Sequence, residues 1–473
     1  MIRKIAIAAT ALALGAVGPA WTQSERPDQT AFKGLYKELV EINTTLSVGN
    51  CTTAANAMAA RLRAAGYPAS DVRVLIPEGH PKFGALTAVL KGSDPRARPI
   101  LLLAHIDVVE AKREDWVRDP FKLIEEGGYF YARGASDDKS MAAIFTDSLI
   151  RYRTEGFKPK RDIKLALTCG EETEDTFDGL DYLLKHNHEA VDAAFALNEG
   201  GGGRLNEQGE RISNGLQVGE KIYQDFYLET TNPGGHSSRP VKDNAIYELA
   251  GGLTRLGQYA FPVEINPVTH AYFAGNAPLT PGAVGQAMAK LGREGPPDLA
   301  AAQVVSEASP SWNAMMRTTC TATMLEGGHA PNALPQRAKA TVNCRILPGH
   351  TVPATMADLT RIIAEPKIRI SLVAEPSTVG VSPPLSFEVI GPAEQVGRRL
   401  WGDKVPLVPM MSTGATDGKF LNAAGIPTYG LSGIFSDPDG GGIHGLNERV
   451  RVRSLYEGRD FLYEVVKLYG MGG

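Results

Sequence analysis

The sequence contains few cysteines, no cluster of basic residues and only one long uncharged apolar run. Four cysteines in 473 residues, none in a CxxC pair, exclude a cysteine-ligated zinc site and a thioredoxin-like motif. A formal net charge of −4 without a basic run provides no electrostatic attraction for nucleic acid. With 43% hydrophobic and 22% charged residues, the composition excludes a disordered chain and a polytopic membrane protein. The length suggests two or three domains.

The one uncharged apolar run lies at the start of the chain. Ile5 to Val17 follows Arg3 and Lys4, and Gly18-Pro19-Ala20 then offers small residues for cleavage. This order predicts an export signal over residues 1–22 and a periplasmic or secreted protein. The alternative is an uncleaved N-terminal anchor, but the run is shorter than the ~20 residues that a membrane span needs.

Two of the cysteines lie in β-type stretches on either side of a turn. In an oxidising compartment Cys320 and Cys344 are therefore candidates for a disulfide bridge. The alternative is a pair of buried free thiols.

Short apolar runs alternate with helical patterns in the first half of the chain. This alternation predicts an α/β fold with a largely parallel sheet and helices on both faces, in which ligands bind beyond the carboxyl ends of the strands. The predicted strands are Val72–Ile76, Leu86–Leu90, Ile100–Ala104, Ile163–Thr168 and Ala193–Leu197, and the helices between them include Met141–Thr154 and Leu180–Lys185.

The pattern changes at about Lys221 to a smaller α+β unit. Its predicted strands are Ile222–Thr231, Met315–Leu325 and Arg337–Leu347, with helices over Asn244–Tyr259 and 351–364. A Pro-, Gly- and Ala-rich stretch from Pro262 to Pro310 forms an elaboration inside it. We therefore predict one catalytic domain, residues 23–220 and 386–473, interrupted by an inserted domain over 221–385.

Histidines and acids follow several of the predicted strands. His105 and Asp107 come after the run Ile100–Ala104, and residues two apart in a strand point the same way. Asp107 can then bind the second ring nitrogen of the histidine and fix its tautomer. Adjacent Asp137 and Asp138 precede a helix, where they need a cation or hydrogen-bond donors; the alternative is a helix cap.

Three further segments add to this set. Glu171 and Glu172 follow another strand, so one can bind a metal while the other acts as a base, and the alternative is an exposed acidic loop. Glu199 ends a third strand, and His444 lies in a glycine-rich loop. Two histidines and three carboxylates match a pair of zinc ions that share a carboxylate, with one glutamate left to move protons.

In order along the chain, these motifs resemble the di-zinc peptidases and deacylases that include carboxypeptidase G2, aminoacylase 1 and carboxypeptidase S. The resemblance covers nearly the whole mature chain and is strongest to the carboxypeptidase S and N-acyl amino acid hydrolase branch. It rests on "HIDVV", "GASDDKS", "NEGG", "GGHSSRP", "RTTCTATMLEGGHAPNALPQRAKATVNCRILPG" and "STGATDGKF".

The resemblance implies a role for each residue at the strand ends. Two Zn²⁺ ions would be bound, with Co²⁺ or Mn²⁺ as possible substitutes. Asp137 would bridge the ions, with a cis peptide bond to Asp138. The remaining roles would be His105 and Glu199 at one ion, Glu172 and His444 at the other, Glu171 as general base and Asp107 orienting His105.

The inserted domain resembles a lid that also forms a homodimer in this family. His236 would stabilise the oxyanion, reaching the site on closure or from a partner subunit, and the alternative is a solvent-exposed loop histidine. Asn332 and Arg345 would face the substrate, with Arg345 binding its carboxylate; the alternative for Arg345 is a surface ion pair.

The resemblance thus implies hydrolysis of a peptide or amide bond next to a free carboxylate, as in a carboxypeptidase or dipeptidase. An N-acyl amino acid deacylase with the same mechanism is the alternative. A non-catalytic peptide-binding protein that keeps the fold is the alternative from a different class.

Overall fold

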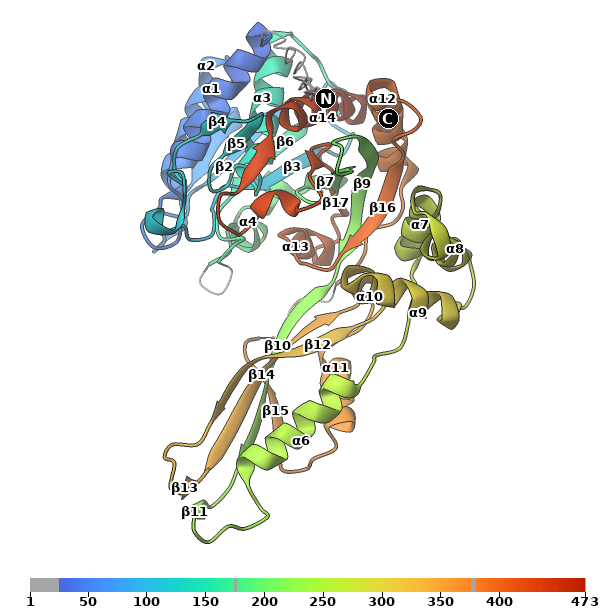
Figure 1. The fold of residues 1–473 in the computed structure, drawn as a ribbon. Helices are drawn as coiled ribbons and strands as arrows, with labels where there is room; N and C mark the ends of the chain where they lie inside the picture. The colour runs from blue at the N-terminus through green and yellow to red at the C-terminus, as the bar shows by residue number, and fades with distance from the viewer. Residues whose placement is uncertain (1–24, 174–176, 376–379, 473) are drawn as a thin grey trace, which may run out of the picture.

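The computed structural model describes residues 25–173, 177–375 and 380–472, so the predicted export signal lies outside the described residues. Figure 1 shows a rounded larger part and an elongated smaller part that projects from it. Within the described ranges, no helix combines the length and the apolar content that crossing a bilayer requires.

A ten-stranded mixed sheet forms the centre of the larger part. Its order is β1-β2-β6-β3-β7-β17-β9-β8-β18, with β16 paired to β9. At its centre β6, β3, β7 and β17 run parallel, which confirms the predicted α/β fold class. The strands are β1 Val72–Leu75, β2 Ala85–Leu90, β3 Ile100–His105, β6 Ile163–Thr168, β7 Phe195–Asn198, β8 Gly202–Leu205, β9 Arg211–Glu220, β16 Leu407–Ser412, β17 Thr428–Gly430 and β18 Phe435–Ser436.

Both faces of this sheet are buried. Alternate residues of β3 point to opposite faces, so Ile100, Leu102 and Ala104 join one core while Leu101 and Leu103 join the other. The first core packs under α1 Pro27–Glu41, α2 Cys51–Ala64, α3 Lys139–Thr154, α12 Phe387–Trp401 and α14 Val452–Met471. The second packs under α4 Gly179–His186, α5 His188–Val191 and α13 Gly418–Ala423. A small sheet of β4 Ile124–Glu126, β5 Tyr129–Tyr131 and β19 Arg449–Arg451 flanks the larger one.

The smaller part is built on an antiparallel sheet in the order β12-β14-β10-β15. One face packs against two helices, and β12 lies at an edge with most of its residues exposed. These elements are β10 Ile222–Thr231, β12 Thr319–Gly327, β14 Arg337–Ile346, β15 Arg369–Leu372, α6 Ala245–Gln258 and α11 Val352–Ile363. A two-residue pairing of β11 Gly235–His236 with β13 Ala333–Leu334 forms the far tip (Figure 1).

The segment between α6 and β12 returns to the larger part. It forms α7 Pro267–Asn276, α8 Gly282–Leu291, α9 Leu299–Ala308 and α10 Pro310–Met315 around a core of its own. α7 packs against β16, and Arg204 of β8 donates a hydrogen bond to Asn276 at 2.9 Å. The prediction of a strand beginning at Met315 was wrong, because Met315 ends α10 and its side chain is buried in the first core.

All four cysteines form disulfide bridges. Cys320 pairs with Cys344, directly opposite it on β14, so of the two alternatives that the sequence left open the bridge is the one formed. Cys51 pairs with Cys169, a bridge that the sequence pattern did not indicate.

Candidate metal centre

The predicted metal ligands meet at one edge of the large sheet. His105 is the last residue of β3, Glu199 follows the last residue of β7, and Glu172 lies four residues beyond β6. Because these three strands are parallel, their carboxyl ends lie together. Two loops complete the ligand cluster, by which we mean His105, Asp137, Glu172, Glu199 and His444.

Asp137 lies between the two histidines of the ligand cluster. Its Oδ1 is 3.1 Å from His105 Nε2, and its Oδ2 is 3.0 Å from His444 Nε2. Glu199 Oε1 lies 3.7 Å from His105 Nε2, and Glu172 Oε2 lies 3.0 Å from His444 Nε2. The ligand cluster therefore has two halves that share one carboxylate. The Asp137–Asp138 peptide bond is cis.

These distances fit a pair of divalent cations. Donor atoms around a tetrahedral zinc ion are separated by about 3.3 Å, since each zinc–ligand bond is about 2.0 to 2.1 Å long. The donor atoms of each half lie within 4.8 Å of one another. Each carboxylate oxygen lies 3.0 to 3.7 Å from the histidine nitrogen of its half. The three carboxylates outnumber the two histidines, so the ligand cluster attracts positive charge.

The pKa values of the two histidines are shifted in the direction that favours positive charge. Burial opposes the charge of His105, but Glu199, Asp107 and Asp137 together raise its pKa well above the ordinary value. Hydrogen bonds that His444 donates to Asp137 and Glu172 raise its pKa to about 10. Without metal ions, the two histidines therefore bind protons strongly. Bound metal ions would supply this positive charge instead.

Glu171 lies beside both halves and differs from the ligands in its electrostatic surroundings. Its carboxylate is within 4.8 Å of donor atoms of His105 and Glu172. Burial, and then the nearby charges of Glu172, Asp107 and Asp137, raise the pKa of Glu171 to about 7. A carboxyl group with a pKa near neutrality is suited to accept and return a proton.

Asp107 lies beside the ligand cluster and links its two halves. His105 Nδ1 is 3.1 Å from the main-chain oxygen of Asp107 and 3.6 Å from its Oδ1, so the nearer acceptor is the backbone. The other carboxylate oxygen of Asp107 accepts the Glu172 N–H at 3.0 Å. Asp107 thus contacts one ligand of each half.

Glu448 is a buried residue of this region that the sequence analysis missed. It accepts hydrogen bonds from Arg133 Nη1 at 2.8 Å and from the N–H groups of Gly134, Ser136 and Asp137 at 2.9, 2.7 and 3.1 Å. It therefore holds the loop that presents Asp137. Its only signal in the sequence is an acid four residues after His444, and nothing in that spacing marks it as buried.

Lys139 is a second buried charge below the same loop. Its Nζ donates to the main-chain oxygen of Ile42 at 2.7 Å, and its side chain is fully buried. Burial lowers the pKa of Lys139 to about 7, although Glu448 and Asp107 oppose this shift. The lysine supports the turn into α3 rather than the ligand cluster itself.

The structure does not bring all the predicted substrate residues to the ligand cluster. His236 and Asn332 are exposed neighbours at the tip of the smaller part, far from β3 and β6 in Figure 1. Arg345 lies on β14, with its guanidinium 4.5 Å from the ring centre of Tyr223. Within one chain, the tip is remote from the proposed chemistry.

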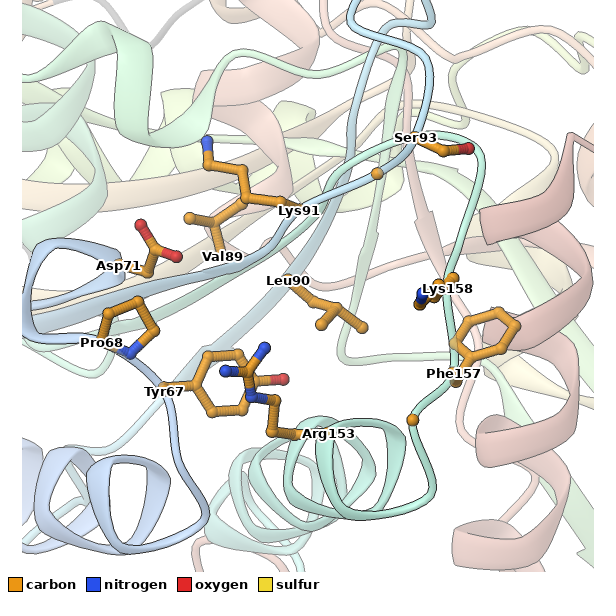
Figure 2. A pocket seen from close by; sticks show the side chains of 12 residues that line it. Tyr67, Pro68, Asp71, Val89, Leu90, Lys91, Ser93, Arg153, Phe157 and Lys158 are labelled. Carbon is orange, nitrogen blue, oxygen red and sulfur yellow. The ribbon is translucent and has the colours of Figure 1, made fainter.

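A cavity of about 390 Å³ lies away from these residues. Figure 2 shows Tyr67, Leu90, Arg153 and Phe157 around it. Leu90 pairs with Ile163 at the start of β6, so this cavity is at the sheet edge opposite the ligand cluster. No predicted catalytic or metal-binding residue lines it, and we do not assign the active site there.

A carboxylate shared by two histidine-containing halves, beside a further acid, fits the centre of a binuclear metallohydrolase. The chain belongs to peptidase family M20/M25/M40, whose family model matches residues 101–468. This membership confirms the family resemblance and makes the protein a metal-dependent hydrolase of peptide or amide bonds.

Known relatives cover most of the chain. The N-fatty-acyl-amino acid synthase/hydrolase PM20D1 of Homo sapiens is 28% identical over 398 residues, 80% of this chain and 75% of the relative. The probable carboxypeptidase S-like 2 of Dictyostelium discoideum is 26% identical over 387 residues, 80% of this chain and 73% of the relative. The metallo-carboxypeptidase Sso-CP2 of Sulfolobus solfataricus shares the fold, with a TM-score of 0.69 at 17% identity over 94% of this chain and 100% of that one.

Proposed function

We propose that the protein cleaves a peptide or amide bond next to a free carboxylate, using two Zn²⁺ ions at the ligand cluster and Glu171 as general base. The observation that carries this proposal is the placement of Asp137, whose two oxygens face two different histidines at 3.1 and 3.0 Å. His105 and Glu199 would hold one ion, Glu172 and His444 would hold the other, and Asp107 would orient His105.

Two divalent cations bound at these residues would polarise the scissile carbonyl and lower the pKa of a water molecule. The carboxylate of Glu171 accepts the proton of the attacking water and later donates it to the leaving nitrogen. His105 at the end of β3 and Glu199 just after β7 are held by the sheet, which keeps this half aligned.

Two classes of substrate, peptides and N-acyl amino acids, fit this reaction. The free carboxylate of either class suits Arg345, because a planar guanidinium can form two parallel hydrogen bonds to it. A peptide substrate makes the protein a carboxypeptidase or dipeptidase. An N-acyl amino acid makes it a deacylase, and the identity of 28% with an N-fatty-acyl-amino acid hydrolase favours testing this class directly.

We also propose a homodimer in which the tip of one smaller part serves the ligand cluster of the other chain. His236 and Asn332 lie at that tip, and β12 leaves a sheet edge open. Exposed apolar side chains gather along this edge and the adjoining helix, with Tyr247 and Leu325 each 69% exposed and Met324 61% exposed. Mixing inactive His236→Ala and His444→Ala proteins should restore activity in mixed dimers. A monomer in light scattering, or no restoration, would contradict the dimer.

Export to the periplasm or the medium is proposed as well. Two disulfide bridges support it, because such bonds form and persist in oxidising compartments. Cell fractionation of the tagged full chain, with mass measurement of its N-terminus, tests both export and removal of residues 1–22.

Metal analysis and a substrate panel test the central proposal. Purified protein should carry two ions per chain and hydrolyse either dipeptides or N-acyl amino acids, with C-terminally amidated substrates cleaved poorly. Preference for one half of the panel decides between peptidase and deacylase. Binding of the panel compounds without turnover of any of them would support the non-catalytic alternative and refute the proposed hydrolysis.

A further inference from the structure

The Cys51–Cys169 bridge joins two elements that are far apart in the sequence. Cys51 is the first residue of α2, and Cys169 directly follows β6, two residues before Glu171. The bridge spans a sequence separation of 118 residues, and both cysteines are buried, at 2% and 4% exposure. It therefore anchors the start of the loop that presents Glu171 and Glu172.

The same bridge lies near Asp107, the residue that joins the two halves of the ligand cluster. Sulfur atoms of Cys51 and Cys169 and a carboxylate oxygen of Asp107 lie within 4.8 Å of one another. Asp107 in turn accepts the Glu172 N–H at 3.0 Å and lies next to His105. The two sulfurs thus form part of the surface against which Asp107 and the loop after β6 are packed.

Backbone hydrogen bonds close the described part of this loop at its start. The main-chain oxygen of Cys169 accepts the Gly179 N–H at 2.8 Å, and Gly170 accepts the Thr173 N–H at 3.3 Å. Gly170 has a φ of +108°, and a side chain there would meet the main-chain oxygen of Phe177 at 2.0 Å. The chain turns sharply between Cys169 and Glu171, so a covalent anchor at residue 169 restricts where both glutamates lie.

The second bridge provides a matched comparison within the chain. Cys320 and Cys344 face each other on paired strands of the smaller part, and their sequence separation is 24 residues. Hydrogen bonds between β12 and β14 already fix that register. Loss of this bridge leaves the sheet pairing in place and does not touch the loop after β6.

We propose that the Cys51–Cys169 bridge is a positioning element of the metal centre, which holds the Glu171–Glu172 segment against Asp107. This inference rests on the proposed function, because it assumes that Glu172 binds a metal ion and that Glu171 moves protons. The bridge acts through these residues and does not touch the substrate.

The test compares Cys51→Ala/Cys169→Ala with Cys320→Ala/Cys344→Ala. Both are first shown to be folded by circular dichroism, and metal affinity is then measured by competition with a chromophoric chelator. We expect the first variant to bind one of its two ions at least about tenfold more weakly, the loss typical when a group that supports a metal ligand is removed. Its kcat should fall with KM little changed, and excess Zn²⁺ should restore part of the kcat. The second variant should match the wild type in all three measurements.

A third protein covers the case in which Cys51→Ala/Cys169→Ala does not fold. In the Cys320→Ala/Cys344→Ala background, a water-soluble phosphine reduces only the remaining bridge: the phosphorus is oxidised with oxygen from water, and each sulfur gains one proton. Mass spectrometry confirms two thiols, the phosphine is removed, and metal affinity and kcat are measured again. Unchanged kcat together with unchanged affinity in the protein with an open Cys51–Cys169 bridge overturns the proposal, as does an equal loss in both double variants. A wild type that binds no metal refutes the proposed function instead, so the two failures are distinct.

Discussion

The two histidines of the ligand cluster occupy contrasting surroundings. The His105 side chain is 2% exposed and ends a strand that is hydrogen-bonded to β6 and β7 on its two sides. The His444 side chain is 56% exposed and lies in a glycine-rich loop, at a positive φ of 58°. One half is built by the sheet, and the other is built by loops that need separate support.

This difference explains where the supporting residues lie. In the His105 half, the strands themselves position His105 and Glu199. The His444 half depends on the loop after β6, which the Cys51–Cys169 bridge anchors, and on the segment around Glu448. Asp137 belongs to both halves, so the loop that Glu448 holds affects the whole centre.

The first prediction concerns Glu171, which we assign to neither half as a ligand. Glu171→Gln should lower kcat by about 10³-fold, within the range of lost general acid–base catalysis. Both metal ions should stay bound, because the ligand cluster is intact. Steady-state kinetics with elemental analysis checks both statements. Loss of an ion would show that Glu171 is a ligand, and full activity would remove it from the mechanism.

The second prediction concerns the loop that joins the halves. Glu448→Gln should lower the free energy of unfolding by about 3 kcal/mol, because it leaves the buried charge of Arg133 without its partner. Urea unfolding measures this change. Glu126→Gln is the control, since Glu126 is 60% exposed and its pair with Arg118 should contribute less than about 1 kcal/mol. Equal effects would mean that Glu448 has no special structural role.

The third prediction addresses the two halves directly. His444→Ala should keep one metal ion with nearly the wild-type affinity, because His105 and the sheet are untouched. His105→Ala should weaken the binding of both ions by more than about tenfold, since it removes the better ordered half. Competition with a chelator provides the affinities. Loss of both ions from His444→Ala would show that the His105 half does not form without the other half.

The fourth prediction uses a buried acid outside the ligand cluster. Burial raises the pKa of Glu220 to about 8, against a hydrogen bond from Thr416 that lowers it. The unfolded chain releases this proton near pH 4.5 and the folded chain near pH 8, so the unfolding free energy falls as pH rises between these values. Between pH 5 and pH 9, the free energy of unfolding of Glu220→Gln should fall by about 2 kcal/mol less than that of the wild type. This difference is smaller than the full pKa shift implies, because relaxation and water entry reduce the cost of burying an ion. Urea unfolding at pH 5 and pH 9 checks this, and exposed Glu207→Gln should follow the wild type.

The sheet and its edge could be predicted because both leave a local pattern. Ile100–Ala104 is a continuous apolar run, as expected of a strand that is buried on both faces, and polar residues follow it at once. The family motifs then supplied roles for these residues. The same local pattern located β10 at Ile222–Thr231 without error.

Other features depend on contacts between distant segments and leave no such pattern. Glu448 is buried because Arg133 and three backbone N–H groups surround it, and none of these is near it in sequence. The pairing of Cys51 with Cys169 needs the position of α2 relative to β6. The helices α7 to α10 lie in a Pro- and Gly-rich stretch, and only packing reveals that they return to β16.

The sulfur atoms beside Asp107 have a further consequence for how the protein is made. Opened to thiols, Cys51 and Cys169 would place two soft ligands next to a set of hard oxygen donors. Thiolates bind copper(I) and zinc strongly, so they would compete with the carboxylates for incoming ions. Protein expressed in a reducing cytosol is therefore exposed to mis-metallation, and its metal content reflects the redox history of the preparation.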